Sequence, residues 1–168
     1  MGGRSRVFRR LRSQEPAPRR LGLIVLVDTT IWSLALRRRR RTLSGEERVL
    51  VDEWTRLVRS GEAVLVGPIR QEILSGIRDE RSFTAIQEIL GDFRYLEIQP
   101  FDYDQAARFF NVCRARGVSG TAIDLLVCAV AHRFDVAIFT TDTDFQRYAS
   151  HLEIRLHESL PRSSPAPD

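Results

Sequence analysis

The sequence predicts an α/β fold, with a parallel sheet of four to five strands covered by helices on both faces. Short apolar runs of strand length alternate with amphipathic helical segments along the chain, and no internal repeat is present. Strands that alternate with helices are typical of βαβ units, whose parallel sheets are buried on both faces. At 168 residues the chain has the length of one domain with a substantial core.

Local signals set the predicted elements. Helices are expected to begin at capping residues or prolines and to end near glycines, and strands are expected at short β-branched apolar runs. In chain order they are a strand at 23–27, a helix from 31, a helix at 44–59, a strand at 63–66, helices at 68–77 and 82–90, a weak strand at 95–98, a helix capped by Asp102 or Asp104 and reaching about 116, a helix at 123–134, a strand at 136–139, a helix at 145–150 and a strand at 152–156. Residues 1–22 are expected to be a disordered Arg-rich extension, 23–157 the folded domain and 158–168 a disordered tail.

The charge of the chain is distributed unevenly. All 26 basic residues are Arg, against 22 acidic residues, and the formal net charge is +4. Residues 1–20 contain seven Arg and one Glu, which leaves −2 for the remaining 148 residues. The high isoelectric point therefore describes a tail more than the body, and the absence of Lys excludes any mechanism that requires an amine.

Other compositional features limit the class of protein. Cys113 and Cys128 are isolated, so we expect two core thiols and neither a disulfide nor a zinc site. The longest apolar run is too short to span a bilayer, so no membrane association is expected. The sequence favours a cytoplasmic protein, with an Arg-rich organelle transit peptide as the alternative.

Acidic residues follow several of the predicted strands. Asp28 comes directly after the first strand, Glu72 lies one turn into the helix after the second, Asp124 is in the first turn of its helix, and Asp142 and Asp144 follow the fourth strand. Each alone could be a helix cap or a solvated side chain. In a parallel sheet, however, these positions converge beyond the carboxyl ends of the strands, where like charges repel unless a cation neutralises them. Carboxylates are suitable ligands for Mg²⁺ or Mn²⁺, which can activate water against a phosphodiester.

Four segments resemble, in order and spacing, the motifs of PIN-domain ribonucleases, and in particular the VapC-like toxins of bacterial toxin-antitoxin pairs. These segments are VLVDTTIW (25–32), QEILSGIR (71–78), RARGVSGTAIDLLVCAVA (114–131) and FTTDTDF (139–145). The resemblance implies a PIN-like (Rossmann-like) sheet and endonucleolytic cleavage of RNA that depends on Mg²⁺ or Mn²⁺. It also implies a homodimer and a cognate antitoxin that inserts a peptide over the acidic site.

The resemblance also implies a role for individual residues. The chain departs from the family at its N-terminus, since such toxins commonly start almost at the first strand, and no role is evident for residues 1–22. Carried over by position, the catalytic, metal-binding acids are Asp28, Glu72, Asp124 and Asp142, with Asp144 as an auxiliary metal ligand and Thr30 and Thr140 as supporting hydroxyl residues.

Several interpretations remain open at this point. The run Arg37, Arg38, Arg39, Arg40 and Arg41 is either a solvated helix surface or an RNA-binding site. The domain could also be a housekeeping RNA-processing nuclease of the same fold, or a binding or dimerisation module without activity. Phosphoryl-transfer folds that need a Lys or a GK[ST] loop are disfavoured, because the chain has neither.

Overall fold

A computed structural model describes residues 24–37 and 42–159 and contains a parallel sheet of five strands. The central strand β1 (Val25–Val27) pairs with β2 (Ala63–Leu65) on one side and with β4 (Ala137–Phe139) on the other. The edges are β3 (Arg94–Tyr95) and β5 (Arg155–Leu156), which gives the order β3-β2-β1-β4-β5. The predicted fold class and strand number are confirmed.

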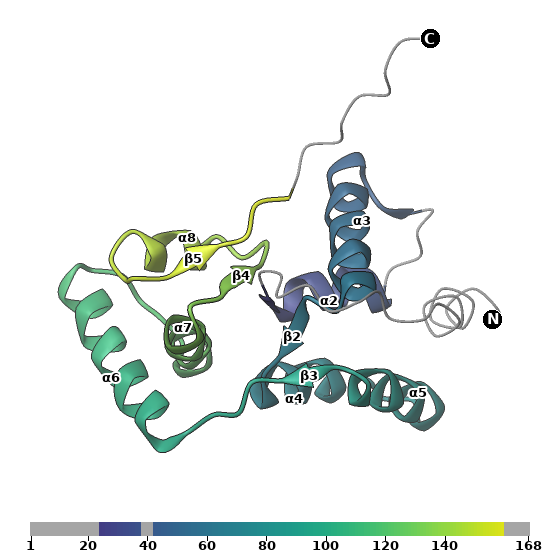
Figure 1. The fold of residues 1–168 in the computed structure, drawn as a ribbon, viewed down its shortest axis with the longest axis horizontal. Coiled ribbons are helices and arrows are strands. Elements are labelled where there is room, and N and C mark those ends of the chain that lie inside the picture. Colours follow the sequence, from purple (N-terminus) through teal and green to yellow (C-terminus); the bar gives the residue numbers. More distant parts are fainter. Residues whose placement is uncertain (1–23, 38–41, 160–168) are drawn as a thin grey trace, which may run out of the picture.

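Seven helices in the described residues cover the sheet (Figure 1). Every residue of β1 and β2 is buried, and because successive side chains of a strand point to opposite faces, both faces of the sheet centre are covered. Figure 1 shows α6, α7 and α8 beside β4 and β5, and the other helices beside β2 and β3. The helices are α2 (Thr29–Arg37), α3 (Gly45–Ser60), α4 (Gly67–Ser75), α5 (Glu80–Gly91), α6 (Pro100–Ala115), α7 (Ala122–Phe134) and α8 (Asp144–Ala149).

Local capping signals predicted some helix ends well and others poorly. Ser44 and Glu47 form a capping box at the start of α3, where the helix at 44–59 was predicted, and Gly61 ends this helix at a φ of 71°. The expectation that Asp102 or Asp104 caps α6 is wrong by several residues. The helix already begins at Pro100, and Asp102 instead accepts the backbone N–H of Gln99 at 2.7 Å. Helix α2 begins at Thr29, two residues before the predicted start.

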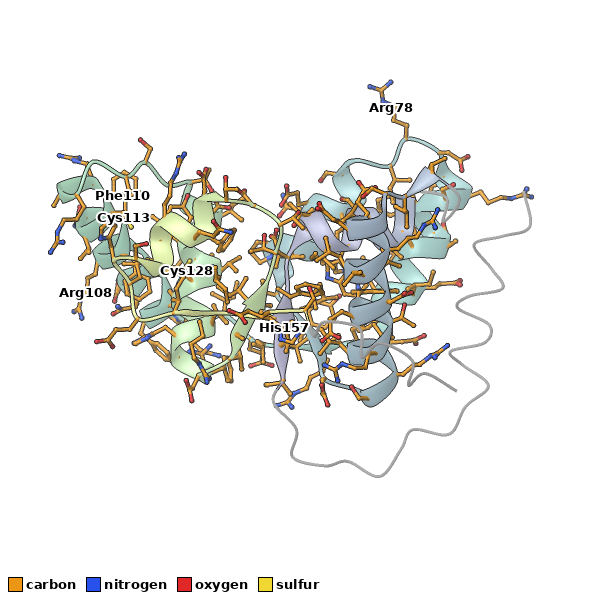
Figure 2. All side chains as sticks on the ribbon, turned by 90° about the horizontal axis from the view of Figure 1, so that it is seen from above. Arg78, Arg108, Phe110, Cys113, Cys128 and His157 are labelled. Atoms are coloured by element: carbon orange, nitrogen blue, oxygen red, sulfur yellow. The ribbon has the colours of Figure 1, made fainter. Side chains whose placement is uncertain are left out.

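The two cysteines are core residues, as predicted. Cys113 lies on α6 and Cys128 on α7, and both are buried free thiols (Figure 2). Burial raises the pKa of each thiol, so both are protonated at neutral pH and neither is an activated nucleophile.

Some predicted features fall on residues that the structure does not describe. The N-terminal extension 1–22, most of the tail 158–168 and the run Arg38 to Arg41 lie outside the described residues, as does the side chain of Arg37. Within residues 24–37 and 42–159, no helix is both long and apolar enough to cross a membrane.

Candidate active site

Asp28 lies at the end of β1, where the chain connections on the two sides of the sheet run in opposite directions. Its backbone N–H donates to Phe139 at 2.9 Å and so extends the ladder between β1 and β4 by one residue. The chain leaves β1 toward β2 on one side and leaves β4 toward β5 on the other, which makes this pair the switch point of the sheet, where ligands bind in open α/β folds. The Asp28 side chain is buried there, with 8% of the residue exposed.

Two threonines hold the Asp28 carboxylate. The Thr30 and Thr140 hydroxyls each donate to Oδ2 at 2.8 Å, and the Thr30 backbone N–H reaches the same oxygen at 3.3 Å. The Thr140 hydroxyl oxygen in turn accepts the backbone N–H of Asp142 at 2.9 Å. Thr140 therefore connects the first and fourth predicted acids directly, through one hydroxyl that donates to one and accepts from the other.

The start of α8 is shaped by Asp142. Its Oδ1 accepts the backbone N–H of Asp144 at 2.9 Å, an Asx-turn bond that fixes the side chain at the helix entry. Asp144 is the first residue of α8 and forms an ion pair with Arg147 at 3.1 Å. Asp142 is therefore anchored to the Asp28 network, whereas the partner recorded for the Asp144 carboxylate is a solvent-exposed Arg.

Asp124 joins this group from the N-terminus of α7. Its backbone N–H donates at 3.0 Å to the hydroxyl of Thr121, the N-cap residue of α7, and its Oδ2 accepts the Tyr148 hydroxyl at 3.3 Å. Burial raises the pKa of Asp124, and the negative charges of Asp142 and Asp28 raise it further, whereas the bonds with Thr121 and Tyr148 act in the opposite direction. The Asp124 carboxylate is therefore close enough to two other predicted acids, Asp28 and Asp142, to interact with their charges.

Glu72 reaches the site from the other side. It is exposed on α4, and its Oε2 accepts the Thr29 hydroxyl at 2.8 Å. A cavity of about 640 Å³ opens here between α2, α3, α4 and the segment after β4, and its lining consists of Thr29, Thr30, Ser33, Leu34, Glu46, Glu47, Leu50, Glu72 and Thr141. Glu72 is thus connected to the site through the start of α2 rather than through the other acids.

The donor set fits a hard divalent cation in chemistry and charge. Among the described residues, no Arg or His forms an ion pair with Asp28, Asp124 or Asp142, so this part of the chain supplies no compensating charge to these carboxylates. Carboxylate oxygens are the ligands that Mg²⁺ and Mn²⁺ prefer. No three Asp, Glu, His or Cys residues in the described part of the chain are already arranged to hold one ion, so binding requires these side chains to approach one another.

Two site residues were missed at the level of sequence. Thr29 is not among the predicted supporting residues, yet its hydroxyl donates to Glu72. Tyr148 gave no signal, because its contact with Asp124 joins residues 24 positions apart and no local pattern encodes it.

The family profile of the PIN domain matches residues 25–150, and the chain therefore belongs to the PIN domain family. Two similar proteins are VapC ribonuclease Mb1587 of Mycobacterium bovis and Ribonuclease VapC11 of Mycobacterium tuberculosis. Each is 27% identical over 124 residues, which cover 73% of this chain and 89% of the relative.

Several solved structures share the fold. FitAcB from Neisseria gonorrhoeae superposes with a TM-score of 0.63 at 18% identity, covering 81% of this chain and 98% of that one. VapBC2 from Rickettsia felis, bound to a DNA fragment from its promoter, gives 0.60 at 11% identity, covering 80% and 98%. VapC20 from Mycobacterium tuberculosis, a toxin that cleaves the sarcin-ricin loop, gives 0.58 at 17% identity, covering 78% and 98%.

Proposed function

We propose that this protein is an endoribonuclease toxin that hydrolyses RNA phosphodiester bonds with Mg²⁺ or Mn²⁺ and is neutralised by a cognate antitoxin. The observation that carries the proposal is the convergence of Asp28, Asp124 and Asp142 at the switch point of the sheet, where no Arg or His of the described residues forms an ion pair with them. The curated relatives are named ribonucleases, which supports the same reaction class.

Asp28, Asp124 and Asp142 are the residues that would hold the metal, with Glu72 and Asp144 as auxiliary acids. A bound divalent ion would lower the pKa of a water molecule and stabilise negative charge on the leaving oxygen. The chain would need no nucleophilic side chain of its own, consistent with its lack of Lys and with its buried, protonated thiols.

The hydroxyl network prepares the acids for this role. All three donors to Asp28 converge on Oδ2, which fixes the carboxylate and directs its other oxygen away from the threonines. Thr140 couples this geometry to Asp142 through a single hydroxyl, and Thr29 fixes the Glu72 carboxylate at the edge of the cavity. Such supporting bonds orient ligand groups and are typically worth 10- to 100-fold in metal affinity or activity.

The partners are proposed from the similar proteins. Several related structures are toxin-antitoxin complexes, some of them bound to DNA, which supports an antitoxin as partner of this chain. A homodimer is proposed on the family resemblance alone. RNA binding requires a local cluster of positive charge, because residues 24–37 and 42–159 are acidic overall, with 14 Arg against 20 acidic residues. The run Arg37–Arg41 is a candidate for this role, with a solvated helix surface as the alternative.

The proposal can be tested with a charge-matched pair of variants. Asp28→Asn removes a central acid, and Asp135→Asn removes an exposed acid whose left-handed backbone, at a φ of 50°, Asn also tolerates. We expect mapping of RNA ends to reveal cleavage by the wild type and by Asp135→Asn with Mn²⁺ or Mg²⁺, and no cleavage by Asp28→Asn or in EDTA.

The contrary results separate the alternatives. Equal cleavage by wild type and Asp28→Asn would reject the assigned site. A wild type that neither cleaves RNA nor is stabilised by Mn²⁺ would indicate a non-catalytic binding module. An active nuclease without an antitoxin-like gene beside its own would favour a housekeeping RNA-processing enzyme.

A further inference from the structure

Tyr148 is the one fully buried tyrosine of the described chain, and it lies beneath the candidate site. Its ring has no exposed surface and packs edge-on against Phe145, with 5.6 Å between the ring centroids. Its hydroxyl nevertheless reaches two polar partners, the Oδ2 of Asp124 at 3.3 Å and the backbone carbonyl of Ser119 at 3.5 Å. A buried hydroxyl with one proton can satisfy only one acceptor at a time, and the charged, closer carboxylate is the stronger one.

The segment between α6 and α7 is pressed against the same ring. A Cβ atom added at Gly120 would lie 2.9 Å from Leu125 Cδ1 and 3.3 Å from Tyr148 Cε1, so the absence of a side chain at this position permits the close approach. Tyr148 therefore contacts both the segment that leads into α7 and the acid in the first turn of that helix. This is the contact pattern of a group that fixes where α7 begins.

We propose that Tyr148 is a positioning residue that holds the Asp124 carboxylate toward Asp28 and Asp142. This inference rests on the proposed function, because it assigns Tyr148 a part in preparing the metal site. Asp124 experiences repulsion from both neighbouring acids. Without a fixed donor, a carboxylate in the first turn of a helix can relieve that repulsion by rotating toward water. The Tyr148 hydroxyl opposes this rotation from below, where no substrate can reach.

The expected consequences differ from those of a substrate-binding residue. Loss of the hydroxyl should weaken Mn²⁺ binding and lower kcat by about 10- to 100-fold, the range found for groups that orient metal ligands. The KM for RNA should stay unchanged, because the ring is buried and cannot touch RNA. The fold should persist, because Phe retains the ring that fills the core.

The test compares Tyr148→Phe with Tyr95→Phe in the full-length chain. Tyr95 is a matched control, since its hydroxyl also makes two hydrogen bonds, accepting from Arg70 at 2.7 Å and donating to the Leu90 carbonyl at 3.1 Å. It lies on the edge strand β3 and bonds to none of the candidate acids. Mn²⁺ affinity is measured by calorimetry and by the metal-induced shift in Tm, and kcat and KM are measured on one RNA. We expect only Tyr148→Phe to lose Mn²⁺ affinity and kcat.

A double-mutant cycle isolates the proposed connection. If Tyr148 acts through Asp124, Tyr148→Phe should have no further effect on Mn²⁺ affinity in an Asp124→Asn background. Wild-type affinity in Tyr148→Phe, equal losses in both tyrosine variants, or additive losses in the cycle would each overturn the inference. A wild type that fails to bind Mn²⁺ would instead remove the proposed function, and the inference with it.

Discussion

The buried acids of the described residues are stabilised in two different ways. Asp102 faces Arg133, whose Nε and Nη2 donate to its two oxygens at 2.7 and 2.8 Å. Glu53 faces Arg56 at 2.9 Å and the partly buried His157 ring at 2.7 Å. Asp28, the third buried acid of the described residues, is held only by hydroxyls and a backbone N–H.

This difference distinguishes acids that stabilise the fold from acids that we assign to the candidate site. A buried charge without an opposite charge is unfavourable, and proteins usually pair it. The ion pair between Asp102 and Arg133 connects α6 to α7. Glu53 is paired with Arg56 and also contacts His157, which connects α3 to the segment after β5. The positive charge missing around Asp28, Asp124 and Asp142 is the part that we assign to a divalent ion. Substitutions in the two kinds of region should therefore fail in different ways.

The largest effect is expected for Asp142→Asn. Because it removes a charge that the proposed metal site requires while the core stays intact, RNA cleavage should fall by more than about 100-fold, beyond the loss typical of a supporting residue. Stability in EDTA should not fall, because repulsion on Asp124 is relieved. Cleavage rates and urea unfolding measure the two quantities. A large loss of stability with cleavage retained would place Asp142 among the structural acids.

Asp102→Asn should show the opposite behaviour. It leaves Arg133 without its charged partner, which should lower the free energy of unfolding by about 2 to 3 kcal/mol. This lies below the range for fully buried pairs because 26% of the Arg133 side chain is exposed. Cleavage per folded molecule, measured below the unfolding transition, should match the wild type. Loss of Mn²⁺ binding in this variant would contradict the division into two kinds of acid.

Thr140→Val should lower metal affinity or kcat by about 10- to 100-fold, because it removes the hydroxyl between Asp28 and Asp142. Val preserves the shape of the side chain. Thr55→Val is a suitable control, since its hydroxyl donates to the Val51 carbonyl within α3. If the two variants retain equal Mn²⁺ affinity, the hydroxyl network has no role in preparing the site.

The smallest expected effect is a pH dependence of the stability that Glu53 contributes. Burial alone would raise the pKa of this carboxyl, but the bonds and charges of Arg56 and His157 outweigh it and lower the pKa below its ordinary value of 4.5. A lowered pKa in the folded state contributes stability above pH 4.5, and this contribution disappears as the pH falls through the folded-state pKa. Urea unfolding should therefore show that the deficit of Glu53→Gln relative to wild type is constant above pH 4.5 and shrinks in acid.

The control for this prediction is Glu88→Gln, an exposed glutamate of α5 for which the described residues show no ion pair. This variant should follow the wild type throughout the titration. A deficit of Glu53→Gln that grows toward low pH would contradict the assigned sign.

The sequence predicted those features that local patterns encode. The capping box of α3 and the order of the elements depend on neighbouring residues, and Asp28 could be placed because it ends a buried strand. The start of α6 was misplaced because Pro100 at the first turn outweighs an Asp two residues later. The partner of Asp124 and the anchor of Glu72 depend on contacts between distant segments, which only the tertiary structure reveals.

The position of Asp28 in the central ladder has a consequence for hydrogen exchange. Its amide proton is bonded to the Phe139 carbonyl, between the central strand β1 and its neighbour β4. Amides of this kind commonly exchange only when the whole domain opens. Local opening of the cavity or of the first turn of α2 should therefore leave the Asp28 backbone protected, and a ligand of the proposed site could bind or leave without displacing the residue at its centre.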